Sequence, residues 1–206
     1  MQLILGDFRE IGDKIPDNSI DLVFTDPPYL RKYISHYGDL GVFAKKKLKE
    51  GGSLVCYVGH YNLKDYLDLI SPHLKYWWIF ALHLQKPGFP MNNRRVVPRY
   101  KPLLWYIKGD AYKGKYIYDH IESKHEGKGF HSWQQSTVEA NHIIDRLTEE
   151  GDTVCDPFLG SGTTGVAALE KHRKFIGIEI DPETYKIAEN RLKHCAICGK
   201  ELEITT

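Results

Sequence analysis

The sequence has few cysteines, no long apolar run and almost no net charge. Four cysteines among 206 residues do not make the disulfide framework of a small secreted domain, so a reducing, cytoplasmic compartment is expected. No apolar run approaches the roughly 18 residues that span a bilayer, and residues 1–7 lack the basic start and long apolar stretch of a signal peptide. A net charge of +1 does not indicate a polyanion partner for the surface as a whole. With 42% hydrophobic residues, the chain is expected to bury one core.

Short apolar segments alternate with amphipathic ones in the first and last thirds of the chain. This alternation predicts an α/β fold with a parallel sheet and helices on both faces. In the middle, residues 76–84 and 103–107 predict an antiparallel pair of strands, residues 86–101 a loop, and residues 110–132 little regular structure. The other strands are expected at residues 3–5, 21–25, 53–58, 153–155 and 174–178, and helices at 43–50, 63–70, 137–149, 163–171 and 182–193.

A first motif, Asp26-Pro27-Pro28-Tyr29, follows the apolar strand at residues 19–25. Its acid accepts hydrogen bonds, the carbonyl of Pro27 is free to do the same, and the tyrosine offers a flat face. This set suits a planar group with an amino function, such as an extruded nucleobase. The alternative is an ordinary turn after a strand.

A second motif, residues 156–164, places Gly160 and Gly162 at a strand–helix junction. Glycines there let a ligand approach the backbone, and the helix N-terminus offers free amides. Glu179 ends the next strand about 20 residues on, the spacing at which a Rossmann-type unit holds a ribose. Thr163 replaces the third small residue of a dinucleotide fingerprint, and no lysine follows Gly162 as in a Walker loop. A nucleoside without a pyrophosphate is therefore expected.

Together the two motifs resemble the catalytic and cofactor motifs of DNA amino-methyltransferases that use S-adenosylmethionine. The catalytic motif precedes the cofactor motif, which resembles the circularly permuted β-class of these enzymes. The resemblance covers residues 1–30 and 130–193, and the middle only loosely. It implies a Rossmann-like, mostly parallel seven-stranded sheet with one antiparallel strand, in which the strand at Leu3 lies beside residues 174–178.

The same resemblance implies roles for individual residues. Asp7 matches an acid that binds the adenine amino group of the cofactor, and Glu179 matches the ribose-binding acid. Residues 131–136 fall where the family often has His-Pro-Thr-Gln-Lys-Pro, although the lysine and both prolines are absent here. The expected cofactor contacts are Asp7, Phe8, Asp26, Gln134, Ser136, Asp156, Phe158, Gly160, Ser161, Gly162, Thr163, Glu179 and Ile180.

The catalytic residues implied are Asp26, Pro27, Pro28 and Tyr29. An exocyclic amino nitrogen is a poor nucleophile because its lone pair is delocalised into the ring. Acceptors on Asp26 and Pro27 would localise that pair, while Tyr29 stacks on the flipped base. No cysteine nucleophile is needed, and Cys56 and Cys155 are expected to be buried in strands.

In the family, Asp at the first motif position favours adenine over cytosine, so an adenine-specific DNA methyltransferase is expected. The alternatives are a methyltransferase acting on the cytosine amino group, on RNA or on a protein amide, and a catalytically inactive nucleic-acid-binding relative. The sequence leaves open whether a restriction nuclease accompanies the enzyme in a restriction–modification pair.

Local charge points to nucleic acid. Residues 86–115 hold eight basic residues against one acid, with asparagines and aromatic residues between them. Contacts to double-stranded DNA are expected from Arg94, Arg95, Arg99 and Lys101. The segment is short for a recognition domain, so either a homodimer completes the DNA clamp or the specificity is low. Residues 45–47, three lysines, are better explained as an exposed helix face than as a nucleic-acid contact.

The expected domain is residues 1–193, with residues 86–130 inserted as a basic DNA-contact region and residues 194–206 as a tail. Cys195 and Cys198 resemble one knuckle of a zinc site, but the sequence supplies no second pair, so no metal is expected. His36 and His60 could edge the pocket, or they could simply pack.

Overall fold

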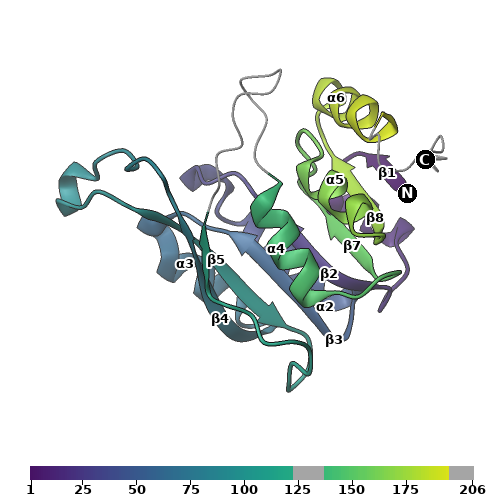
Figure 1. The fold of residues 1–206 in the computed structure, drawn as a ribbon, viewed down its shortest axis with the longest axis horizontal. Helices are drawn as coiled ribbons and strands as arrows, with labels where there is room; N and C mark the ends of the chain where they lie inside the picture. The colour runs from purple at the N-terminus through teal and green to yellow at the C-terminus, as the bar shows by residue number, and fades with distance from the viewer. Residues whose placement is uncertain (123–136, 195–206) are drawn as a thin grey trace.

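The computed structural model describes residues 1–122 and 137–194, which build one eight-stranded sheet between two layers of helices (Figure 1). Along the sheet the strand order is β1-β8-β7-β2-β3-β5-β4-β6. The strands are β1 (Gln2–Leu5), β2 (Ile20–Thr25), β3 (Leu48–Tyr57), β4 (Lys75–His83), β5 (Tyr100–Ile107), β6 (His120–Glu122), β7 (Thr153–Asp156) and β8 (Lys174–Glu179).

The strand directions confirm a mostly parallel sheet. Within it β5 runs antiparallel to both of its neighbours, β3 and β4, and the remaining pairs are parallel. β1 lies beside β8, with Leu3 opposite Gly177, as the resemblance implied. The sheet has eight strands rather than seven because the short β6 pairs with the end of β4, in a stretch for which no strand is expected.

The helices are α1 (Phe8–Ile11), α2 (His36–Lys47), α3 (Leu63–Ile70), α4 (Val138–Leu147), α5 (Thr163–Glu170) and α6 (Pro182–Lys193). Apolar side chains of α4, α5 and α6 pack on one face of the sheet, and those of α1, α2 and α3 pack on the other. Both faces are therefore buried at the centre of the sheet, which explains the nearly continuous apolar runs of β2, β5 and β7, whereas Tyr76 and Trp78 of β4 stay exposed. No helix within the described ranges has the length and apolar character needed to cross a bilayer.

The helix expected at residues 43–50 is wrong at both ends. α2 begins seven residues earlier, at His36, and ends at Lys47, while Leu48 already pairs with Ile20 of β2. Gly52 lies inside β3, where a β-carbon would come within 2.9 Å of the Lys49 carbonyl oxygen. The sequence pattern did not predict the start of this strand, because residues 49–50 are charged and exposed and interrupt the apolar pattern.

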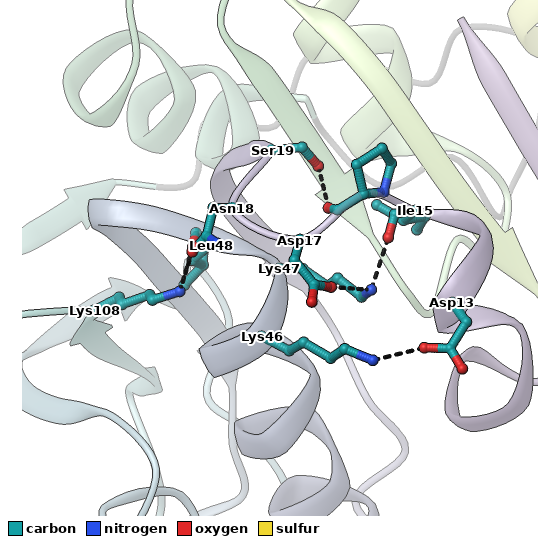
Figure 2. Close-up of polar contacts among 10 residues, drawn as sticks. Asp13, Ile15, Asp17, Asn18, Ser19, Lys46, Lys47, Leu48 and Lys108 are labelled. Carbon is teal, nitrogen blue, oxygen red and sulfur yellow. Dashed lines mark hydrogen bonds and ion pairs between the residues drawn. The ribbon is translucent and has the colours of Figure 1, made fainter.

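A group of polar contacts connects the end of α2 to the segment before β2, at the edge of the sheet where β2 and β3 begin (Figure 2). The Lys47 ammonium is buried and donates to the Asp17 carboxylate at 2.6 Å and to the Ile15 carbonyl at 2.7 Å. Lys46 pairs with Asp13 at 2.7 Å on the surface. Lys47 is thus a structural residue, located at the edge of the sheet opposite to the carboxyl ends of β2 and β3.

Residues 84–99, called the arm from here on, are the predicted loop between β4 and β5, folded back on itself like a hairpin. Its backbone amides at Leu84, Gly88 and Met91 donate to carbonyls across the hairpin, at 2.8–2.9 Å. A short 3-10 turn, residues 92–94, makes the tip. Figure 1 shows the arm projecting beyond the layered body of the protein.

Candidate active site

Four carboxylates stand in a row along one edge of the sheet. The parallel strands β1, β8, β7 and β2 are consecutive neighbours. Parallel strands end at the same edge, and ligands of such sheets bind outside these carboxyl ends. The four acids at these strand ends are, in order, Asp7, two residues after β1, then Glu179 and Asp156, which end β8 and β7, and Asp26, which directly follows β2.

A pocket opens at the β1 and β8 end of this row. Its walls combine apolar rings with the two acids of that end, Asp7 and Glu179. The Phe8 and Phe158 rings contact each other, with centroids 5.0 Å apart. The lining residues are Gly6, Asp7, Phe8, Arg9, His36, Pro157, Phe158, Ile178, Glu179 and Ile180.

The Glu179 carboxylate is held in place by backbone amides. One oxygen accepts from the Gly160 amide at 2.8 Å and the other from the Asp181 amide at 3.0 Å. Each oxygen keeps a lone pair for a hydroxyl donor, as vicinal ribose hydroxyls require. Gly160 and Gly162 have φ of +52° and +82°, a left-handed backbone that side-chain-bearing residues rarely adopt.

Asp7 carries a partner that the sequence motif did not reveal. It caps α1 by accepting from the Arg9 amide at 3.0 Å, and the Arg9 Nε donates to it at 2.9 Å. The Arg9 hydrogen bond holds the pKa of Asp7 below its usual value. Asp7 is therefore ionised, and an incoming amino group must share the carboxylate with Arg9.

One hydrogen bond joins the two sequence motifs. The Thr25 hydroxyl, directly before Asp26, donates to the Asp156 carboxylate at 2.6 Å. The same carboxylate oxygen accepts from the Phe158 amide at 3.1 Å. Burial raises the pKa of Asp156 to about 6. The first motif and the glycine-rich loop are thereby held at adjacent strand ends.

Asp26 is half-buried, and loss of water around it raises the pKa of its carboxyl to about 6. The positive charge of Lys101 opposes that rise and the charge of Asp156 adds to it. The Tyr29 hydroxyl donates to the Asp26 carboxylate, so the ring that follows the prolines lies against the acid. The Lys101 ammonium lies 5.9 Å from the centre of the Tyr57 ring, at the root of the arm.

Tyr37 also reaches this motif from α2. It is fully buried, and its hydroxyl lies 3.0 Å from the Tyr57 carbonyl oxygen and 3.4 Å from the Pro27 carbonyl oxygen. Burial raises the pKa of the Tyr37 hydroxyl, which therefore stays protonated and donates. No sequence motif assigns this residue a role in the site.

Comparison with known proteins agrees with this geometry. A profile described as DNA methylase, for N6 and N4 enzymes, matches residues 20–138 and 120–190. The chain belongs to the DNA methylase family. It is an S-adenosylmethionine-dependent amino-methyltransferase that acts on DNA.

Relatives and solved structures are similar over nearly the whole methylase. Type II methyltransferase M2.DpnII of Streptococcus pneumoniae is 28% identical over 94% of this chain and 90% of its own length. The orphan methyltransferase M.BamHII of Bacillus amyloliquefaciens is 30% identical, over 93% and 95%. The structure of the PvuII DNA methyltransferase (cytosine-N4-specific) superposes with a TM-score of 0.79 at 23% identity, covering 92% of this chain and 85% of that one. The M1.HpyAVI complex with its methyl donor gives 0.71 at 24% identity, covering 93% and 98%.

The pocket of the methylase fits S-adenosylmethionine by the chemistry of its lining. Two aromatic walls suit an adenine, and two acids at one end suit an amino group and ribose hydroxyls. Of the expected cofactor contacts, the pocket gathers Asp7, Phe8, Phe158, Glu179 and Ile180, and it adds Arg9 and His36. Gln134 and Ser136 lie outside the described residues.

Arg191 of α6 is hydrogen-bonded to the glycine-rich loop of the methylase. Its guanidinium donates to the Ser161 carbonyl at 3.0 Å, the Ser161 hydroxyl at 3.2 Å and the Thr163 hydroxyl at 3.0 Å. This contact joins elements 28 and 30 residues apart, and no local motif signals it.

The remaining predicted residues are spread over two places. Arg94 and Arg95 lie exposed at the tip of the arm and Arg99 at its base, whereas Lys101 lies beside the catalytic motif. Two lysines of the basic segment bind the body of the protein instead: Lys108 donates to Asn18 at 2.6 Å (Figure 2), and Lys115 pairs with Glu149.

The described cysteines and His60 have structural surroundings. Cys56 and Cys155 are buried and free, as predicted, and burial raises the pKa of both thiols. His60 packs against Tyr100, with ring centres 4.8 Å apart. Residues 1–122 and 137–194 contain no cluster of His, Cys, Asp and Glu that could hold a metal ion. Cys195 and Cys198 lie outside the described residues.

Proposed function

We propose that the methylase is adenine-specific and methylates the exocyclic amino nitrogen of a base flipped out of double-stranded DNA. The observation that carries this proposal is the hydrogen bond between Thr25 and Asp156. It holds the base-binding motif and the cofactor loop at neighbouring strand ends, where a methyl group and an amino nitrogen can meet.

For the cofactor, Asp7 accepts the adenine amino group, and the touching rings of Phe8 and Phe158 form an apolar wall against the adenine ring. Glu179 accepts the ribose hydroxyls, because backbone amides already fix its orientation. The cofactor supplies an electrophilic methyl group when it is bound. The other proposed contacts are Asp26, Gln134, Ser136, Asp156, Gly160, Ser161, Gly162, Thr163 and Ile180.

For the base, Asp26 and the Pro27 carbonyl accept the two amino hydrogens and localise the nitrogen lone pair. A carboxyl whose pKa is about 6 is a stronger acceptor than an ordinary Asp, yet it is mostly ionised at pH 7. As the nitrogen gains a fourth substituent, it loses a proton, and Asp26 is the base within reach. Pro28 fixes the backbone, and the half-exposed Tyr29 ring stacks on the base after releasing Asp26.

Adenine is favoured over cytosine by Asp26 itself, because the resemblance associates Asp at this position with adenine. Arg94, Arg95 and Arg99 contact the duplex, and no acid occurs in residues 84–101 to oppose their charge. Lys101 contributes positive charge where the duplex meets the pocket.

The organisation proposed around this site is a domain of residues 1–193, in which the exposed part of residues 86–130, namely the arm and Lys101, serves DNA, with residues 194–206 as a tail. A homodimer would supply a second DNA-contact region, since the arm is short for a recognition domain. Free buried cysteines support a cytoplasmic location.

The test is transfer of a tritiated methyl group to duplex DNA, followed by nucleoside analysis. N6-methyladenine is expected, and Asp26→Ala should abolish transfer while leaving cofactor affinity nearly intact. Asp65→Ala, an exposed acid on α3, is the matched control. Formation of N4-methylcytosine would contradict adenine specificity and support the cytosine alternative. The absence of any methylated base on every duplex tested would refute the proposal.

A further inference from the structure

The aromatic side chain of Phe89 is exposed to solvent. It is 94% exposed, and Val96 and Val97, on the opposite strand of the arm, are 52% and 48% exposed. Single exposed apolar residues are common on protein surfaces. An almost fully exposed phenyl ring near two further exposed apolar residues on a projecting segment is less common. Such a group indicates a surface that another molecule covers.

The arm holds Phe89 in a defined position. Pro87 and Pro90 restrict the backbone on both sides of the Gly88–Phe89 pair. The Gly88 amide donates to the Pro98 carbonyl at 2.9 Å, and a β-carbon on Gly88 would lie 3.1 Å from the Pro98 ring. A side chain presented on such a backbone loses little conformational entropy when it binds.

Charge decides which partner fits. Residues 84–101 contain Lys86, Arg94, Arg95, Arg99 and Lys101 and no acid. A basic surface with an apolar tip complements a nucleic-acid duplex, whose phosphates flank a stack of apolar base faces.

The arm also starts at the correct edge of the sheet. β4 runs in the same direction as β2, so the arm leaves β4 on the side where Asp26 follows β2. Its root residue Lys101 is close enough for its charge to act on Asp26.

We propose that Phe89 is a wedge that enters the base stack next to the target and stabilises the flipped state. The inference rests on the proposed function, because it requires duplex DNA as the substrate. A paired base has to be unpaired and unstacked before it reaches the pocket, and an inserted apolar side chain fills the space that the base leaves.

The experiment compares two duplexes that carry the site found by methylation mapping of plasmid DNA. In one the target base is paired, and in the other an abasic site replaces its partner. Phe89→Ala should slow single-turnover methylation of the paired duplex about 10- to 100-fold, and that of the unpaired duplex less than about threefold. Phe89→Trp should stay near wild type on both. Ile187→Ala, which removes a 59% exposed side chain from α6, is the control and should change neither rate.

A direct readout is the fluorescence of 2-aminopurine at the target position, which rises when the base leaves the stack. Phe89→Ala should reduce that rise without a matching loss of DNA affinity, whereas Arg94→Ala should weaken binding to both duplexes equally. Equal slowing of both duplexes by Phe89→Ala, no slowing of either, or a changed oligomeric state would overturn the wedge alone. A wild-type protein that methylates no duplex would overturn the proposed function together with it.

Discussion

Lowering the pH from 7 to 5 should slow methyl transfer about tenfold. The pKa of Asp26 is raised to about 6, mainly by loss of water. About 90% of the carboxyl is then ionised at pH 7 and about 10% at pH 5, whereas an ordinary Asp would stay over 90% ionised at both. Only the ionised form accepts two hydrogen bonds freely, so the rate should fall with the ionised fraction as protons are added.

The assay is single-turnover methylation at saturating cofactor and DNA between pH 5 and 8, because slow product release would otherwise hide the chemical step. Asp26→Asn keeps one acceptor oxygen but cannot titrate. Its rate at pH 7 should fall roughly 10- to 100-fold, as expected for losing a charged hydrogen bond, and its pH profile should become flat near 6.

Asp156 needs its own control because its pKa is also raised to about 6 and its charge acts on Asp26. Asp156→Asn removes a negative charge, which should lower the pKa of Asp26 and move the acid limb of the rate profile to lower pH. A limb that persists near pH 6 in Asp26→Asn, or a wild-type rate that is flat from pH 5 to 8, would refute the reasoning.

Substitutions at three further contacts, each with a control variant, test other parts of the site and the fold. Tyr29→Phe keeps the ring and frees Asp26, so its transfer rate should stay within about threefold of wild type, whereas Tyr29→Ala should lose roughly 10- to 100-fold through lost stacking; equal losses in both would contradict the stacking role. Arg191→Ala should weaken cofactor affinity roughly tenfold by calorimetry, since about 1.4 kcal/mol of loop support is lost, and the exposed Lys186→Ala on α6 should not. Lys47→Met leaves the Ile15 carbonyl without its donor and should lower stability by about 1–3 kcal/mol, seen as a Tm lower by several degrees, while Lys46→Met on the surface should leave Tm unchanged.

Much of the fold could be predicted because its elements carry strong local patterns. The limits of α3 and α6 match the expected residues, since Pro72 follows one helix and Asp181 and Pro182 begin the other. The start of β3 was missed because its first residues gain strand geometry from pairing with β2, not from their own preferences. β6 was missed for the same reason: three residues become a strand only beside the end of β4.

The acids of the site follow from the strand order, but their partners do not. Asp7, Asp156 and Glu179 each end or follow a recognisable strand, so their placement at one edge could be inferred. The hydrogen bond from Thr25 to Asp156 joins residues that are 131 positions apart in the sequence. It depends on how β2 and β7 pair, which the sequence does not show. Arg9 could have been suspected from its position two residues after Asp7, since a short helix brings the two together.

The pairing of β1 with β8 has a consequence for synthesis. Asp7 leaves the ribosome early and Glu179 among the last of the described residues, yet the two line the same pocket. A nascent chain therefore carries its base-binding motif long before it can hold a methyl donor. Among the described strands β1 pairs with β8 alone, so a chain cut short before residue 174 loses both one wall of the pocket and the partner of its first strand. Such chains are expected to lose cofactor binding and the packing of the N-terminal strand together.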